Sequence, residues 1–501
     1  MIMKFLVLFV YCALPLLVSA QANTYNIIPK PAKLTPRSGQ FVFDSHTRIV
    51  APIREPNVFN AVFVLMERLL LTTGFNTEVV DITREDIRPG RNMVYCQIDT
   101  SLGKEAYKLT ISADRIDILA GSATGIFYAM QTIRQLLPPE IERNRLASGV
   151  EIAVPCAVIE DEPVFSYRGV MLDTSRHFSS INALRRYIDI LAFHKINHLH
   201  LQLSNDQGWR IQIDKYPNLT QTGAWRDSTI TGMQPLDDEE ERTYNRRRYG
   251  GFYTKEQMRN VLAYAERRFV TIVPEISMPG HSLAALASYP EFSCTGSEFA
   301  VASHWGQFED VFCAKDETLE FIENVIAEIV ELFPGKYIHI GGDEFSKTRW
   351  QNCENCQAKL EELGLENEEE LKNYFLNRIE NFAASKGKQI LMRDTINVSL
   401  NFSYCYSQNS THRWLCADGY LPLENVYDFV PAPEQIGSQA NLWSEYLTSE
   451  MYVEYMLLPR ITALSEALWT PSEQKKFEEF RLRLSPMLKR FDAMNIVYSS
   501  Q

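Results

Sequence analysis

Short apolar runs alternate with longer amphipathic segments from Tyr167 onward. The apolar runs are RGVMLD, INHLHLQLS, VTIVPEIS, KYIHIGGDE, KQILMRD and IGSQANLW. The amphipathic segments between them are 181–194, 255–268, 317–333 and 368–386. Helices that alternate with strands return the chain to the same end of a sheet, so the strands are expected to be parallel. We therefore predict an α/β fold, with a closed (β/α)8 TIM-type barrel over residues 165–501.

An open, doubly wound sheet is the alternative arrangement of parallel strands, but no GxGxxG motif follows the first run to support a nucleotide site there. Polar residues follow the predicted strands at their carboxyl ends, the face on which barrel enzymes place their chemistry. These residues are Asp173–Arg176, Asn205, Asp206, Glu275, Asp343, Glu344, Asp394 and Trp443–Glu445. The pattern predicts an active site at that end of the barrel.

The part of the chain before the barrel has two further patterns. Residues 1–20 combine one Lys, an apolar run and a small-residue ending, which indicates a secretory signal peptide rather than a membrane anchor. Residues 23–160 contain the alternating run YKLTISADRIDILA and the amphipathic run GSATGIFYAMQTIRQLLP, which predict a hairpin and a helix. We expect an exported protein, periplasmic or secreted, with a small α+β domain ahead of the barrel and a boundary near Pro163.

The formal net charge of −13 is spread along the chain, and the longest basic run is the short stretch 246–248. This distribution argues against nucleic acid as a partner.

Eight cysteines remain after the signal peptide, and an exported chain can pair them. Cys294 with Cys313, and Cys353 with Cys356, are candidate disulfides. A zinc site would need a second CxxC or a His pair near Cys353, and the sequence shows neither there. His198 and His200 lie in mid-strand. We therefore expect structural or free thiols and no metal.

Four motifs together resemble the family-20 glycoside hydrolases, the β-N-acetylhexosaminidases. They are DTSRHF at 173–178, DQGWRI at 206–211, PGH at 279–281 and HIGGDE at 339–344. The resemblance extends to the small N-terminal domain and to the closing segments LWSEY and PRITALSEALW. It implies an exo-acting enzyme without a cofactor that removes terminal β-linked N-acetylglucosamine or N-acetylgalactosamine from oligosaccharides or glycoconjugates, with retention.

In this family the 2-acetamido oxygen of the substrate attacks the anomeric carbon and gives an oxazolinium ion. The resemblance implies that Glu344 is the general acid and base, and that Asp343 orients the acetamido group and stabilises its developing positive charge. Gly341 and Gly342 are expected to relax the backbone so that both carboxylates reach the cavity. His281 matches the histidine of a relay that supports the acid.

The resemblance also implies a set of sugar-binding residues. Arg176 matches the arginine that binds the hydroxyls of the terminal sugar, and Glu445 the carboxylate that holds its distal hydroxyls. Trp350 and Trp443 resemble aromatic residues of the pocket wall. Tyr406 is the best match for the tyrosine that hydrogen-bonds the acetamido oxygen.

The sequence departs from the family pattern in four places. Asn205 stands where the family has the aspartate expected to complete the relay, and Ser277 replaces another aspartate, so we expect the tuning of Glu344 to be weakened. Arg393 occupies the place of a pocket tryptophan. The segment 394–419 is too short for the family's landmarks, so roughly one strand–helix unit is expected to be deleted or eroded. The alternative function is therefore a catalytically impaired relative that binds amino-sugar glycans.

Overall fold

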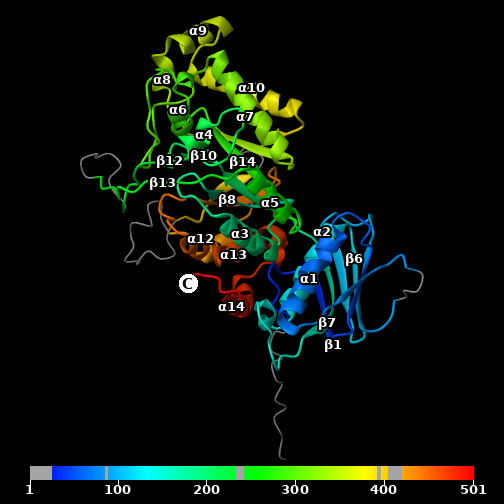
Figure 1. The fold of residues 1–501 in the computed structure, drawn as a ribbon. Coiled ribbons are helices and arrows are strands. Elements are labelled where there is room, and N and C mark those ends of the chain that lie inside the picture. Colours follow the sequence, from blue (N-terminus) through cyan, green and yellow to red (C-terminus); the bar gives the residue numbers. More distant parts are fainter. Residues whose placement is uncertain are drawn as a thin grey trace, which may run out of the picture.

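Two seven-stranded sheets organise the chain in the computed structural model, which describes residues 25–84, 89–232, 242–342, 344–391, 396–403 and 420–500. The first sheet belongs to a small domain and the second to a larger one (Figure 1). The predicted signal peptide, Asp343, Arg393 and Tyr406 lie outside the described residues.

The small domain is a mixed sheet in the order β1-β7-β5-β6-β4-β2-β3 with two helices packed side by side against it (Figure 1). Its strands are β1 (Lys33–Val42), β2 (Arg48–Ala51), β3 (Glu78–Asp81), β4 (Met93–Ile98), β5 (Tyr107–Ile111), β6 (Arg115–Ala120) and β7 (Ala153–Asp161). Its helices are α1 (Val58–Thr73), α2 (Ala123–Leu136) and the 3₁₀ turn η1 (Pro139–Glu142). The predicted hairpin is the antiparallel pair β5–β6, and the predicted helix is α2.

The second sheet has the order β16-β15-β14-β9-β8-β18-β17, and every neighbouring pair in it is parallel. The strands are β8 (Tyr167–Asp173), β9 (His198–Gln202), β14 (Thr271–Met278), β15 (Tyr337–Gly341), β16 (Gln389–Ile390), β17 (Asn397–Asn401) and β18 (Gly437–Leu442). The first strand, β8, pairs with both the second and the last. A doubly wound open sheet does not have this cyclic order, so the sheet is a TIM-type barrel.

Helices and short strands fill the connections between the barrel strands, and further helices follow the last strand, β18. The helices are α3 (Ile181–Phe193), α4 (Asn218–Gln221), α5 (Lys255–Glu266), α6 (Leu283–Ser288), η2 (Pro290–Phe292), α7 (Asp316–Leu332), α8 (Thr348–Gln351), α9 (Glu354–Leu363), α10 (Glu368–Ser385), α11 (Leu423–Asp428), α12 (Glu450–Leu457), α13 (Arg460–Trp469), η4 (Ser472–Gln474) and α14 (Phe477–Ala493). The short strands are β10 (Ser204–Asn205), β11 (Gly208–Trp209), β12 (Trp225–Arg226) and β13 (Tyr249–Gly250). All residues of β8 and β18 are buried, which suits strands covered on both faces.

The described residues hold seven barrel strands, one fewer than the eight of a complete (β/α)8 barrel. The unusual connection joins β16 to β17, because only residues 391–396 separate the two strands. A crossover between parallel strands normally needs a dozen or more residues, so no helix of ordinary length fits there. The eroded strand–helix unit was expected in the segment 394–419, of which the structure describes residues 396–403, and the short connection before β17 agrees with that expectation.

A buried polar cluster joins the small domain to the barrel. Asp161, the last residue of β7, accepts hydrogen bonds from Tyr107, from Lys195 at 3.1 Å and from the indole of Trp469 at 2.8 Å. Lys195 lies just before β9. The small domain therefore docks at the amino ends of the barrel strands, opposite the face where the chemistry is expected.

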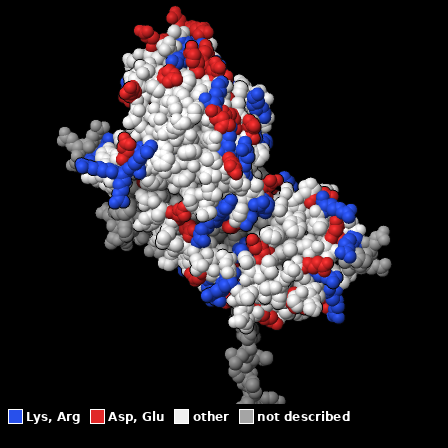
Figure 2. Space-filling model, viewed as in Figure 1, with Lys and Arg blue, Asp and Glu red and all other residues white. Residues whose placement is uncertain are grey.

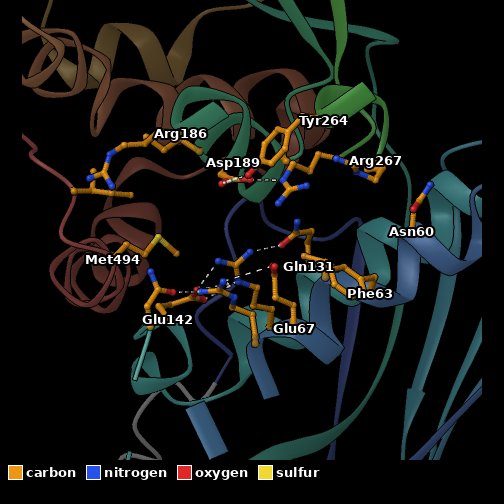
Figure 3. A pocket seen from close by; sticks show the side chains of 18 residues that line it. Asn60, Phe63, Glu67, Gln131, Glu142, Arg186, Asp189, Tyr264, Arg267 and Met494 are labelled. Atoms are coloured by element: carbon orange, nitrogen blue, oxygen red, sulfur yellow. Dashed lines mark hydrogen bonds and ion pairs between the residues drawn. The ribbon is translucent and has the colours of Figure 1, made fainter. Parts of the chain in front are cut away.

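A hollow of about 270 Å³ lies beside this junction, between α1 and α2 of the small domain and α3 and α5 of the barrel (Figure 3). Its charged side chains pair with one another: Arg134 with Glu142 at 2.5 Å, and Arg268 with Asp189. The first pair lies within the small domain and the second within the barrel, so each side of the hollow pairs its own charges.

Charged side chains of both signs are interspersed on the face shown in Figure 2, and acidic ones gather at the end formed by α9 and α10. The acidic residues of the first turn of α10 are Glu368, Glu369 and Glu370. Among the described residues, no helix combines the length and the apolar character needed to cross a bilayer.

Candidate active site

A cavity of about 890 Å³ opens at the carboxyl ends of the barrel strands. Several strands contribute residues to it: Met171 from β8, Gln202 from β9, Glu275 from β14, Gly341 from β15, Asn401 from β17 and Asn441 from β18. The polar strand ends singled out in the sequence that line this cavity are Arg176, Asn205, Glu275, Glu344, Trp443 and Glu445, whereas Asp343 and Asp394 lie outside the described residues.

A hydrogen-bonded chain of three residues reaches this cavity. His281 Nδ1 lies 2.7 Å from Asp206 Oδ2, and His281 Nε2 lies 3.3 Å from Glu344 Oε2. Asp206 is fully buried, whereas the side chain of Glu344 is 56% exposed. Asn205 was expected to weaken the relay, but the neighbouring Asp206 supplies the carboxylate that contacts His281.

A short hairpin places Asp206 for this contact. β10 and β11 pair across Asn205 and Gly208, so Asp206 lies in the turn between them. Its backbone N–H donates to Asn205 Oδ1 at 2.7 Å, and its Oδ1 accepts from the backbone N–H of Leu283. Asn205 therefore supports the turn, and Asp206 points at the histidine.

The backbone at the other two members of the relay adopts the left-handed conformation that few residues other than glycine favour. The φ angles are 53° at His281 and 49° at Glu344. Gly341 and Gly342, with φ of 71° and 95°, precede the acid. Left-handed non-glycine residues cluster at functional sites, where the surrounding structure offsets about 1–3 kcal/mol of strain. The two glycines allow the chain to leave β15 in the direction that brings Glu344 to His281.

The relay sets the protonation of its members. Burial would lower the pKa of His281, but its hydrogen bonds to Asp206 and Glu344 outweigh burial and raise the pKa to about 9. The hydrogen bond from His281 lowers the pKa of Glu344, and Gln307 lowers it further. In the open cavity the proton of the pair therefore resides on His281, and Glu344 is a carboxylate.

A second charged cluster lines the same cavity. Arg176 donates from Nη1 to Asp173 Oδ2 at 2.9 Å, and its Nε lies 3.5 Å from Glu445 Oε1. The guanidinium carbon is 5.4 Å from the centre of the Trp443 ring. Burial raises the pKa of Glu445, although the charge of Arg176 opposes that rise. The structure thus brings Arg176, Trp443 and Glu445 together in the wall of the cavity.

Trp350 does not belong to this wall. Its side chain is fully buried, its ring lies 4.5 Å from that of Phe345, and its indole donates to the backbone oxygen of Phe312 at 2.8 Å. The interpretation of Trp350 as a pocket aromatic is therefore wrong. The sequence could not reveal this, because Trp350 follows the motif closely but lies on the short helix α8, whose buried side faces the core.

Sequence reasoning missed several residues that line the cavity. Trp305 and Gln307 come from the long connection between α6 and α7, and Tyr446 follows β18. The run ASHWGQF has neither helical nor strand periodicity, so no pattern pointed to it. Its residues enter the site only because the connection folds back over the barrel.

A largely buried polar network lines the floor of the cavity. Glu275 Oε2 lies 2.8 Å from His200 Nε2 and 3.3 Å from His339 Nδ1. These histidines lower the pKa of Glu275 well below its ordinary value, although burial alone would raise it. Ser277 donates to the backbone oxygen of Ser204 at 2.9 Å. The replacement of the family aspartate by Ser277 therefore leaves no unpaired group at that position.

The four cysteines considered as disulfide partners are free thiols. The sulfur atoms of Cys294, Cys313, Cys353 and Cys356 all lie within 4.8 Å of one another. The sequence showed no second ligand pair near Cys353 and Cys356. The fold supplies one, because it brings Cys294 and Cys313 from a separate connection to the same place.

The chain is similar to known proteins at three levels: family sequence models, individual relatives and solved structures. The sequence model for "Glycosyl hydrolase family 20, catalytic domain" matches residues 165–419 and 402–472, and that for "Glycosyl hydrolase family 20, domain 2" matches residues 24–162. The chain is 37% identical over 94% of its length to a β-hexosaminidase of Porphyromonas gingivalis, of which it spans 64%. It is 30% identical over 89% of its length to a β-hexosaminidase of Vibrio furnissii, of which it spans 77%.

Among solved structures, the chain is similar to the GH20 exo β-N-acetylglucosaminidase of Vibrio harveyi in complex with N-acetylglucosamine. The TM-score is 0.79 at 29% identity, and the match covers 96% of this chain and 79% of that one.

Proposed function

The chain belongs to glycosyl hydrolase family 20, and we propose that it is an exo-acting β-N-acetylhexosaminidase. The single observation that carries this proposal is the relay Asp206–His281–Glu344. It presents one carboxylate to a cavity at the carboxyl ends of the barrel strands. The proposed substrates are terminal β-linked N-acetylglucosamine and N-acetylgalactosamine in oligosaccharides or glycoconjugates.

Glu344 acts in both steps of the proposed reaction. In the first, its protonated carboxyl gives a proton to the glycosidic oxygen as the bond to the anomeric carbon breaks. In the second, its carboxylate takes a proton from the water that attacks that carbon. A bound sugar shields Glu344 from water, which raises the pKa of the carboxyl and favours transfer of the relay proton from His281 to Glu344. The relay is therefore a source of the acidic proton.

The nucleophile of the first step is the acetamido oxygen of the substrate itself. It bonds to the anomeric carbon on the face opposite the departing group, and water later attacks from the face that the leaving group vacated, so two inversions retain the configuration. We assign Asp343, which follows Gly342 in the sequence, to the stabilisation of the positive charge on the acetamido nitrogen. Tyr406 is assigned to the acetamido oxygen. No cofactor takes part.

Arg176, Glu445 and Trp443 are assigned to the terminal sugar. Asp173 and Glu445 hold the guanidinium group of Arg176 in place, which suits its bidentate contact with hydroxyls. The ring of Trp443 can stack on the apolar face of the sugar. The similarity to the exo β-N-acetylglucosaminidase of Vibrio harveyi supports exo action.

The proposal extends to the cellular context. Residues 1–20 are taken as a signal peptide that exports the protein to the periplasm or beyond. Residues 23–160 form the family's N-terminal domain, and residues 165–501 form the catalytic barrel.

The test compares the wild type with Glu344→Gln on 4-nitrophenyl N-acetyl-β-glucosaminide. We expect the rate to fall by about 10² or more, because the amide gives up no proton. Glu256→Gln, an exposed substitution on α5, is the matched control and should keep the wild-type rate. Equal rates for Glu344→Gln and the wild type would overturn the enzyme proposal. A wild type without turnover, whose melting temperature rises with N-acetylglucosamine, would establish the alternative of an impaired glycan-binding relative.

A further inference from the structure

Four thiols from three separate parts of the chain meet beside the active-site barrel. Cys294 follows η2, Cys313 lies shortly before α7, Cys353 caps α9, and Cys356 lies in its first turn. Cys313, Cys353 and Cys356 are buried, and Cys294 is half-buried. The cluster lies where the connection from β14 to α7 meets the connection from β15 to α10.

The distances between the sulfur atoms match those between neighbouring sulfur ligands of a tetrahedral metal site. Cys313 Sγ lies 3.7 Å from Cys353 Sγ and 3.6 Å from Cys356 Sγ, and Cys294 Sγ lies 3.8 Å from Cys356 Sγ. A tetrahedral site with zinc–sulfur bonds of about 2.3 Å separates its sulfurs by about 3.8 Å. A disulfide would instead need about 2.05 Å between two of them. Each of the three contacts is thus close to the tetrahedral edge.

The surroundings of the cluster suit thiolates. The backbone N–H of Ala314 points at Cys356 Sγ at 3.4 Å, and such amide donors orient and stabilise metal-bound sulfur. Cys353 and Cys356 lie at the amino end of α9, where the helix dipole favours negative charge. The half-buried Cys294 leaves a path by which an ion can enter.

We propose that Cys294, Cys313, Cys353 and Cys356 form a structural site for a thiophilic divalent metal, Zn²⁺ in the first instance. On binding, four S–H groups lose their protons to solvent and four sulfur–metal bonds form, with no change in oxidation state. Four protein ligands close the coordination sphere, so the ion has no open position for substrate or water. Its role is to fix the backbone segments that carry its ligands.

The two segments that the four cysteines join, 295–312 and 344–353, both reach the active site. The segment 295–312 carries Trp305 and Gln307 in the cavity wall, and Glu344 begins the segment that ends at Cys353. Two further contacts join the segments between these points: Arg349 pairs with Asp310 at 2.8 Å, and Trp350 donates to the backbone oxygen of Phe312. The metal therefore positions the acid and one cavity wall relative to each other, a role that rests on the proposed function.

The test begins with the full chain, purified without chelator and analysed for bound metal by mass spectrometry. We expect about one equivalent of zinc per chain, four thiols that react only after denaturation with chelator, and replacement of zinc by Co²⁺. The cobalt form should show thiolate-to-cobalt charge transfer and the d–d bands of tetrahedral sulfur coordination. These readouts do not depend on any variant or on activity.

The double variant Cys353→Ser/Cys356→Ser should bind no zinc and melt at a lower temperature. Cys96→Ser, which alters a buried thiol of the small domain on β4, is the matched control and should keep its zinc. If the double variant does not fold, the metal content and the cobalt spectrum of the wild type decide the matter.

Two outcomes would overturn the inference: disulfides among these four cysteines in non-reducing peptide maps, or four free thiols that bind no zinc after equilibration with it. Either result together with normal turnover would leave the proposed function standing. Bound zinc in a chain without turnover would retain the site and remove its link to catalysis.

Discussion

The imidazole of His281 stands 2.7 Å from the buried carboxylate of Asp206, and this contact connects the interior of the barrel with the exposed acid Glu344. The raised pKa of His281 depends on it. The consequences of this contact can be measured separately from those of Glu344 itself.

Asp206→Asn should lower kcat by about tenfold or more, because His281 loses the charge that stabilises its protonated form and can no longer hold the relay proton near neutral pH. The measurement is the pH profile of kcat with a chromogenic substrate, whose alkaline limb should move to lower pH. Asn205→Ala is the matched control in the same hairpin. It removes the partner of one backbone N–H and should change stability more than the profile.

Folding stability should fall as the pH rises from about 6.5 to about 9. The pKa of His281 is raised from 6.5 to about 9 in the folded chain. The protonation of His281 therefore contributes its full stabilisation of the folded state below pH 6.5, and this stabilisation is lost as the pH passes 9. The contribution amounts to about 3 kcal/mol at most. Urea unfolding at a series of pH values measures it, and His281→Gln should flatten this part of the curve. An unchanged slope in that variant would contradict the assignment.

Arg176→Lys should lower kcat/KM by about 10², because an ammonium group cannot reproduce the fork that Asp173 and Glu445 hold in place. Kinetics and the inhibition constant of free N-acetylglucosamine are the readouts. Arg481→Lys, an exposed substitution on α14, should leave both unchanged. Equal losses in the two variants would show that the effect does not come from the site.

Trp350 and Trp443 should respond differently to replacement by Phe. Trp350→Phe leaves the oxygen of Phe312 without its donor and should lower the free energy of unfolding by about 2 kcal/mol, with little change in KM for the folded enzyme. Trp443→Phe should mainly raise KM, because the half-buried Trp443 faces the cavity. Denaturant unfolding and steady-state kinetics on both variants separate the two roles.

The local patterns of the sequence predicted the architecture well. Alternation of strands and helices indicated a barrel, and the motifs around Arg176, His281 and Glu344 indicated where its chemistry lies, because side-chain periodicity and turn residues act over a few positions of the chain. The shortened connection after β16 was also visible as a missing length of sequence.

Partners that meet through space were not predictable in this way. Sequence position pointed to residue 205 as the relay partner, and the turn between β10 and β11 gave that role to Asp206. Trp350 joined the core, Trp305 entered the cavity, and four thiols gathered from distant segments. Short-range steric and hydrophobic preferences made the elements and the available chemical groups readable from the order of residues alone. Which groups touch depends on how the connections pack in three dimensions, because packing brings together residues that no local period relates.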